Sequence, residues 1–387
     1  MVVYVTTQGS KIVREGRHLL VKKADTTYHT IFPYKLEQLV LFGNIQLTPY
    51  ALKLLLRENI DTVFLRFDGR YQGRLASVEQ KNVFLRKRQF LLTDDEAFCL
   101  KTAKSIVYGK IANMATVAQR IARTRNSEKA ARLASSIRDT ARIVDSTKSL
   151  PTLRGVEGNA TALYFQTLRI GLDHDHGFKR RIRRPPTDPV NSVLSLIYTF
   201  LINRVYAAVR VAGLDPYPGV LHSLDYGRHS LPLDLIEEFR PIIADTLTLS
   251  LFNLEILKAN DFYRPNITIE QTCKAIDPDP IASAINDPLG RMSLVEDEDE
   301  LFDMPVQHMD EQLAEHETND GGKQSVKIWP EAFKRILQAF ERKMTTEFYH
   351  PVAEQKMTYA EALVFQARLY RQVVEGEAAT YRPLLMK

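Results

Sequence analysis

The stretch Thr93-Asp94-Asp95-Glu96 marks the point at which the sequence changes from one structural pattern to another. It joins a potential capping residue to a group of acids, which is typical of a helix start. A long run rich in Ala, Arg, Lys and Leu follows without a proline until Pro151, and its apolar residues recur with a helical period. The residues before this boundary follow a different pattern, so the boundary decides the fold class.

The first 75 or so residues predict a β-rich domain with a single helix. Short apolar segments broken by glycines predict strands over residues 2–7, 11–13, 18–21, 38–42 and 62–65. Thr48 followed by Pro49 predicts a helix that begins there and ends near Asn59. We expect an α+β fold with an N-terminal β-rich domain over residues 1–78, a linker over 79–93 and a larger all-α domain over 94–387.

Helical periodicity sets the expected organisation of the second domain. The predicted helices cover residues 94–124, 127–146, 156–171, 188–212, 232–257, 330–347 and 358–374. Residues 274–325 break this pattern with 14 Asp and Glu against 3 Lys and Arg. Because strong net charge and low hydrophobicity oppose folding, we expect a disordered acidic insert there.

The charge balance points to a polyanionic partner. The chain carries a net charge of +5, but the acidic insert accounts for −11, which leaves +16 on the remainder. Clustered Lys and Arg bind nucleic acid by neutralising phosphates, independently of sequence. The charge therefore indicates the class of polymer and no more.

Composition limits the compartment and the chemistry. Two cysteines, Cys99 and Cys273, give neither a disulfide framework nor a CxxC metal pair. The N-terminus lacks the pattern of a signal peptide, and we expect no apolar stretch long enough to cross a bilayer. A cytoplasmic protein without membrane contact is expected. Neither GxxxxGK[ST] nor a strand-linked GxGxxG occurs, so nucleotide hydrolysis and dinucleotide chemistry have no support.

The segment from His222 to Pro241 carries the main candidate site. Asp234, Glu237 and Glu238 are spaced i, i+3 and i+4, so on a helix their carboxylates can lie near one face and hold one cation. One imidazole with carboxylates suits Mn²⁺ or Mg²⁺. The alternative is structural, because acids in a first helical turn are common partners of the helix dipole. In this segment Ser230 is the expected N-cap and Pro232 lies in the first turn.

Two further segments are candidates outside that stretch. Glu157 lies between Gly155 and Gly158, which would let backbone or substrate come close, although an ordinary acid near a helix start is the alternative. A basic cluster precedes two prolines, so we expect an exposed loop able to reach phosphates. The members of this cluster are Lys179, Arg180, Arg181, Arg183 and Arg184. Arg66, in the N-terminal domain, is a weaker candidate for the same kind of contact.

Taken together, these segments resemble a known family. The motifs are Val3-Tyr4-Val5-Thr6, Leu41-Phe42-Gly43-Asn44, Arg154-Gly-Val-Glu157-Gly158, Asp188-Pro-Val-Asn191 and the whole of His222 to Pro241. They resemble the CRISPR-associated integrases and nucleases of spacer acquisition, the family called Cas "one". The resemblance covers most of the chain, and the last block is highly specific. The acidic insert is a departure from the usual pattern.

The resemblance implies both a fold and a site. It implies an N-terminal β domain, a helical domain and a divalent ion, Mg²⁺ or Mn²⁺, on the positions matching Glu157, His222 and Glu237. Asp234 would be a neighbouring active-site acid. Tyr198 aligns with an active-site tyrosine and Arg240 with a basic residue near the metal.

The resemblance also implies a reaction and partners. In this reaction the 3′-hydroxyl of captured DNA attacks a phosphodiester at the edge of the CRISPR repeat, and water in its place gives endonuclease activity. The expected partners are double-stranded DNA (prespacer and repeat), a second copy in a homodimer, and the small Cas "two" subunit bridging two dimers. A non-catalytic DNA-binding scaffold and a branched-DNA repair nuclease are the alternatives.

Overall fold

The computed structural model describes residues 1–387 except 25, 67–70, 76–81, 184, 265–324 and 387. Two four-stranded sheets form the N-terminal domain, with strand orders β1-β5-β7-β8 and β4-β3-β2-β6. In the first sheet β1, β5 and β7 run parallel, and β8 is antiparallel to β7. The strands are β1 (Val2–Val5), β2 (Ser10–Glu15), β3 (His18–Lys23), β4 (Thr26–Ile31), β5 (Gln38–Phe42), β6 (Ile45–Leu47), β7 (Asp61–Leu65) and β8 (Tyr71–Leu75).

Helix α1 (Pro49–Arg57) packs within the β domain and was predicted from its start signal. The hydroxyl of Thr48 accepts a hydrogen bond from the backbone N–H of Ala51 at 3.3 Å, as the capping pattern predicted. Strands β4, β6 and β8 were not predicted. Strand β4 is mostly exposed and lacks a buried alternating face, while β6 has only three residues, so neither carries the apolar pattern that identifies a strand.

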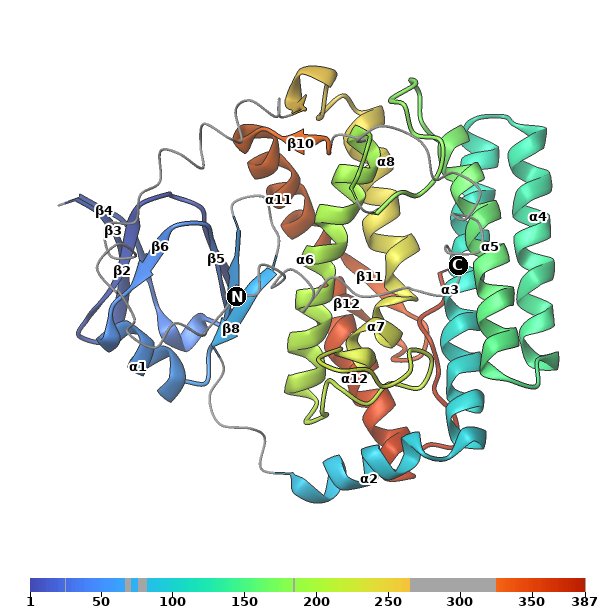
Figure 1. Ribbon diagram of the computed structural model, residues 1–387, viewed down its shortest axis with the longest axis horizontal. Coiled ribbons are helices and arrows are strands. Elements are labelled where there is room, and N and C mark those ends of the chain that lie inside the picture. Colours follow the sequence, from blue (N-terminus) through green and yellow to red (C-terminus); the bar gives the residue numbers. More distant parts are fainter. Residues whose placement is uncertain (25, 67–70, 76–81, 184, 265–324, 387) are drawn as a thin grey trace, which may run out of the picture.

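The second domain is mainly helical, which confirms the predicted fold class (Figure 1). The observed helices follow the predicted ranges closely, apart from the segment after His222 and the start of α5, which begins at Leu150 and not near residue 156, so Glu157 lies well inside the helix. They are α3 (Glu96–Thr124), α4 (Glu128–Ile143), α5 (Leu150–Ile170), α6 (Pro189–Val211), α7 (Ser230–Ile236), α8 (Thr246–Asn253), α11 (Pro330–Met344) and α12 (Tyr359–Glu375). Short antiparallel pairs also occur in this domain, β9 (Phe262–Tyr263) with β10 (Lys327–Ile328) and β11 (Glu347–His350) with β12 (Gln355–Thr358).

Part of the expected linker is a helix. Residues Val83–Thr93 form α2, capped by Asn82, whose side chain accepts from the N–H of Leu85 at 3.1 Å. Gln89 on this helix is buried and donates to the carbonyl of Asp215 at 2.8 Å. The segment is therefore anchored to the helical domain. The expected acidic insert, residues 274–325, lies outside the described residues except for its last position.

The expectation that no stretch could cross a bilayer was wrong for α6, which has the length and apolar composition of a membrane span. Its most apolar window is 67% buried inside the protein, and the helix packs against α7 and α12. A core helix of a folded domain has the same composition because it is apolar on several faces.

The β domain joins the helical domain through aromatic contacts with α6 and α11 (Figure 1). The ring of Phe42 on β5 lies 5.0 Å from that of Phe333 and 6.1 Å from that of Phe200, measured between centroids. Tyr4 donates to the carboxylate of Glu341 at 2.6 Å. Burial of aromatic rings with one satisfied polar link gives a firm interface.

Candidate active site in the helical domain

Four elements that are distant in sequence converge on one set of charged side chains. Glu157 comes from α5, His222 from the loop before α7, and Glu237 from the turn that follows α7. Lys110, from the middle of α3, contacts both glutamates. Lys110 thus joins two of the ligand positions implied by the resemblance, and His222 lies near enough to Glu237 to help lower its pKa.

Lys110 links the two carboxylates. Its ammonium donates to Glu157 Oε1 and lies 2.5 Å from Glu237 Oε2. The residue is only 4% exposed. Burial alone would lower the pKa of Lys110, but the two carboxylates raise it above its ordinary value. The ammonium therefore stays charged and holds the two acids together.

Glu237 is the more deeply placed of these acids, with an exposed fraction of 2%. Arg240 donates to its Oε1 at 2.7 Å. Burial would raise the pKa of Glu237, but Arg240 and Lys110 together lower it to about 2. The carboxylate is thus ionised at any ordinary pH and available to a cation.

Asp234 fixes the position of His222. One of its oxygens, Oδ1, lies 2.7 Å from His222 Nδ1 and accepts the backbone N–H of His222 at 2.9 Å. The other oxygen accepts the N–H groups of Val220 and Leu221 at 2.6 and 3.0 Å. Asp234 is fully buried. A carboxylate that holds one ring nitrogen leaves the other, Nε2, to serve as a ligand.

Two further contacts hold the loop that carries His222, one with the start of α7 and one with α5. At Gly219 a Cβ atom would lie 2.8 Å from Asp234 Oδ2 and 2.7 Å from Ser230 Cβ, so only glycine permits this close approach. Arg154, one turn before Glu157, donates to the carbonyl of Leu221 at 3.0 and 2.5 Å. Glu157 and His222 are therefore positioned by one connected set of bonds.

Tyr198 lies next to this cluster and not inside it. Its hydroxyl donates to Asp245 at 2.6 Å, and its ring lies 5.2 Å from the guanidinium carbon of Arg240 and 5.3 Å from that of Arg181. Burial raises the pKa of Asp245 to about 6 despite the hydroxyl and guanidinium groups around it. Arg240 thus touches both Glu237 and Tyr198.

The segment after His222 departs from the single helix that the sequence predicted. Helix α7 ends at Ile236, a turn carries Glu237 and Glu238, and residues Arg240–Asp245 form a π-helix that leads into α8. Pro241 has no N–H to donate, which breaks the regular α-helical ladder at this point. Ser230 is the first helical residue and not the N-cap; its hydroxyl donates to the carbonyl of Ser223 at 3.0 Å.

The three acids of this segment do not share one face. Asp234 points to the His222 loop and Glu237 to the cations, whereas Glu238 points to the C-terminal segment. Because the turn interrupts the helix between Ile236 and Phe239, the expected i, i+3, i+4 alignment is lost. The prediction that one face could hold all three carboxylates was wrong for Glu238.

The side chains of the basic cluster differ in exposure. Lys179, Arg180 and Arg183 are exposed, as the loop pattern predicted, whereas Arg184 lies outside the described residues. Arg181 turns inward and donates to Asn191 Oδ1 at 2.9 Å and Ser195 Oγ at 3.0 Å. Burial lowers the pKa of Arg181 to about 10. The expectation of an exposed side chain was therefore wrong for Arg181, because residues of α6 bind its guanidinium. Arg66 is partly exposed just after β7.

Three residues of the site escaped the sequence reading: Lys110, Arg154 and Asp245. For Lys110 a signal existed. It falls on the buried stripe of α3 with Ala103, Ile106 and Met114, where a lone cation needs a partner. Arg154 belongs to a motif quoted for the resemblance, but its contact with the His222 loop depends on the fold, as does the position of Asp245.

The donor set fits a divalent ion, although the ligands are not gathered around an empty centre. Among the described residues no group of three or more His, Cys, Asp or Glu side chains has the geometry of a metal site. Lys110 takes up the space between the two carboxylates, and its ammonium lies 2.5 Å from the Oε2 atom of Glu237. Two carboxylates and one oriented imidazole are suitable ligands for Mg²⁺ or Mn²⁺.

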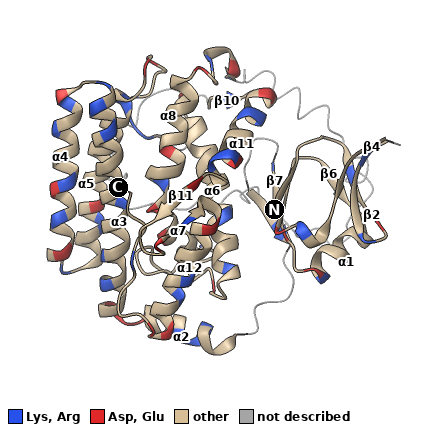
Figure 2. Cartoon of the chain, turned by 180° about the vertical axis from the view of Figure 1, so that it is seen from behind, with Lys and Arg blue, Asp and Glu red and all other residues tan. Residues whose placement is uncertain are grey.

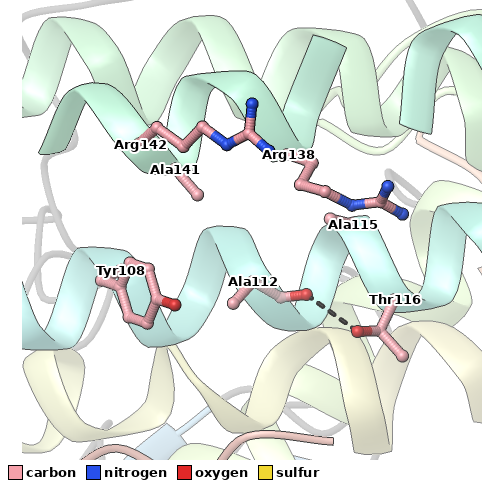
Figure 3. Close-up of a pocket in the computed structure, with 7 residues that line it drawn as sticks. All are labelled: Tyr108, Ala112, Ala115, Thr116, Arg138, Ala141 and Arg142. Carbon is pink, nitrogen blue, oxygen red and sulfur yellow. Dashed lines mark hydrogen bonds between the residues drawn. The ribbon is translucent and has the colours of Figure 1, made fainter. Parts of the chain in front are cut away.

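A pocket between α3 and α4 does not belong to this cluster (Figure 3). It is lined by Tyr108, Thr116, Arg138 and Arg142, with three alanines between them. Tyr108 and Lys110 are two residues apart, so they lie about 200° apart around the helix. The outer helix α4 carries both signs of charge, with the acids Glu128 and Asp139 among four Lys and Arg residues (Figure 2).

Comparison with known proteins gives a consistent result. The family model described as "CRISPR associated protein Cas1" matches residues 3–272. A relative from Thermus thermophilus, named CRISPR-associated endonuclease Cas1 3, is 30% identical over 387 residues, which cover 99% of this chain and 95% of the relative.

Two solved structures share the fold. A casposase bound to integration product aligns with a TM-score of 0.76 at 17% identity, over 100% of this chain and 94% of the other. A Cas6-RT-Cas1–Cas2 complex aligns with a TM-score of 0.73 at 22% identity, over 99% of this chain and 36% of that much longer chain. The extent of the family match and the Thermus relative show that the chain belongs to the CRISPR associated protein Cas1 family.

Proposed function

We propose that this protein is a metal-dependent DNA endonuclease and integrase that inserts captured DNA into a CRISPR repeat array, as part of antiviral defence. The observation that carries the proposal is that Lys110 joins Glu157 to Glu237, while His222, oriented by Asp234, lies near enough to Glu237 to affect its pKa. Membership of a family with relatives named as endonucleases supports it. The casposase bound to integration product shares the fold and supports a strand-joining reaction.

The proposed reaction is a transesterification. The 3′-oxygen of the captured strand forms a bond to phosphorus, the existing P–O bond breaks, and a 3′-hydroxyl is released on the repeat strand. When bound, Mg²⁺ or Mn²⁺ would supply Lewis acidity that lowers the pKa of the attacking hydroxyl and offsets charge on the phosphate. Glu157, His222 and Glu237 would hold the ion, and Asp234, which fixes His222 Nδ1, would leave Nε2 available for ligation. Arg240 lies beside Glu237, where its charge would stabilise an anionic phosphate.

The proposal extends to partners. The exposed side chains of Lys179, Arg180 and Arg183, with Arg66 on the β domain, would bind the phosphate backbone of double-stranded DNA and position it without reading its sequence. The complex containing Cas2 among the similar structures supports a small Cas2 partner. We further propose a homodimer, two of which the partner bridges, acting on chromosomal DNA in the cytoplasm.

The test is strand transfer by the full chain on a plasmid that carries CRISPR repeats. We expect activity with Mn²⁺ or Mg²⁺, none in excess chelator, and none for Glu157→Ala or His222→Ala even though both still bind DNA. Glu128→Ala, a change of an exposed acid on α4, is the matched control and should keep full activity. Activity that survives in chelator would refute the metal dependence. Equal activity on four-way DNA junctions without repeats would instead favour a repair nuclease.

A further inference from the structure

The buried ammonium of Lys110 lies where a shared cation would lie. It contacts one carboxylate oxygen of Glu157 and one of Glu237, from α5 and from the turn after α7. Among the residues that the structure describes, no other lysine is buried. A lysine on an apolar stripe usually extends its flexible stem to reach water, and this one does not.

Around the two glutamates the charges are balanced without a metal. Glu157 and Glu237 carry two negative charges, and Lys110 and Arg240 carry two positive charges. A divalent ion placed between the carboxylates would add two positive charges beside two that are already buried. Uncompensated buried charge is strongly unfavourable, so the ion and the ammonium compete for the same carboxylate oxygens.

We propose that Lys110 is a built-in substitute cation, which stabilises the metal-free site and which a divalent ion must displace in order to bind. The inference rests on the proposed metal site at Glu157, His222 and Glu237. Two consequences follow: Lys110 holds the carboxylates in place before the metal arrives, and it weakens the affinity of the site for that metal. The displaced side chain has a flexible four-carbon stem, so it can leave without moving α3.

The test is Mn²⁺ titration of the metal-free full chain, followed by electron paramagnetic resonance, together with melting temperatures in chelator and in Mn²⁺. We expect Lys110→Met to bind Mn²⁺ about tenfold more tightly than the wild type, which corresponds to about 1.4 kcal/mol. Its melting temperature should be lower in chelator, and the rise caused by Mn²⁺ should be larger. Lys104→Met, on the same helix, removes a lysine that donates to the carbonyl of Asp145 at 2.8 Å, and should leave Mn²⁺ affinity unchanged.

Lys110→Gln, which keeps a hydrogen-bond donor without the charge, serves if the methionine variant does not fold. Unchanged or weaker Mn²⁺ binding by the Lys110 variants, with normal binding by the wild type, would overturn this inference and leave the metal site standing. Absence of Mn²⁺ binding by the wild type and by both Lys110 variants would overturn the proposed metal site as well.

Discussion

Glu237 and Glu238 are neighbours in the chain and equally buried, yet they lie in opposite environments. Glu237 faces the ammonium of Lys110 and the guanidinium of Arg240, and its pKa falls to about 2. Glu238 faces uncharged donors, namely Gln366 Nε2 at 2.8 Å, the Tyr381 hydroxyl at 2.9 Å and the Leu384 N–H at 2.9 Å. Burial raises the pKa of Glu238 to about 8, because hydrogen bonds alone do not offset the loss of hydration.

The same division is present on the facing helix. Gly109 lies against the C-terminal segment, where a Cβ atom would lie 2.4 Å from Pro383, while Lys110 reaches the cluster around Glu237. Burial by itself therefore says nothing about the role of an acid here. The charge of the facing groups separates the proposed metal site, on one side of the turn, from a structural anchor on the other side.

The largest effect on activity should come from Glu237→Gln, and the same exchange at Glu238 is its comparison. Glu237→Gln removes a charged ligand, so we expect the metal-dependent cleavage rate to fall at least about 1000-fold, or about 4 kcal/mol in activation free energy. Glu238→Gln touches no proposed ligand and should keep most of the activity. The measurement is plasmid cleavage in Mn²⁺ under single-turnover conditions. Equal losses in both variants would remove the functional distinction between the two sides.

The clamp formed by Asp234 should give the next largest effect. Asp234→Ala leaves the backbone N–H groups of Val220, Leu221 and His222, and the Nδ1 atom of His222, without their acceptor. We expect a loss of about 3 kcal/mol in the free energy of unfolding and an activity lower by about 10- to 100-fold. Urea unfolding monitored by circular dichroism measures the first. A variant as stable as the wild type would show that the loop is held by other contacts.

The pH dependence of stability should differ in sign between the two glutamates. For Glu238 the folded-state pKa is raised to about 8, so its contribution is present below about pH 4.5 and is lost as the pH rises toward 8. The free energy of unfolding should fall by on the order of 1 kcal/mol per pH unit in that window. For Glu237 the pKa is lowered to about 2, so its contribution is present above about pH 4.5 and is lost as the pH falls toward 2.

Melting temperatures between pH 5 and 8 check the first part of this prediction. The difference between wild type and Glu238→Gln isolates the single carboxyl group, since all other titrating groups are shared. The glutamine variant should show the flatter profile. Parallel profiles would mean that Glu238 titrates at its ordinary pKa.

The smallest effect should come from removing one hydrogen-bond donor to Glu238. Tyr381→Phe removes the hydroxyl that donates to Glu238 while keeping the buried ring. We expect a loss of about 1 kcal/mol in the free energy of unfolding, with Mn²⁺ affinity unchanged. Chemical denaturation with parallel Mn²⁺ titration measures both. A weakened Mn²⁺ site would show that the two sides of the turn are coupled.

Much of the fold could be predicted from local patterns, whereas the site could be predicted only in part. The start of α3 and the cap at Thr48 depend on neighbouring residues, and both were found in the sequence. The link from Lys110 to Glu157 and Glu237 joins residues far apart in the chain, so no spacing rule reveals it. Glu238 points to the C-terminal segment, and Arg181 turns inward to Asn191. Both orientations likewise depend on segments that meet only in the folded chain.

The bond between Glu238 and the N–H of Leu384 also sets an order of events during synthesis. Asn113, on α3, is tied to the same tail, since it donates to the carbonyls of Glu238 and Leu384 at 2.9 and 2.8 Å. The turn that carries Glu237 cannot be fully supported until the ribosome has released the chain as far as Leu384. A chain that is still being synthesised therefore lacks part of the support for the proposed site.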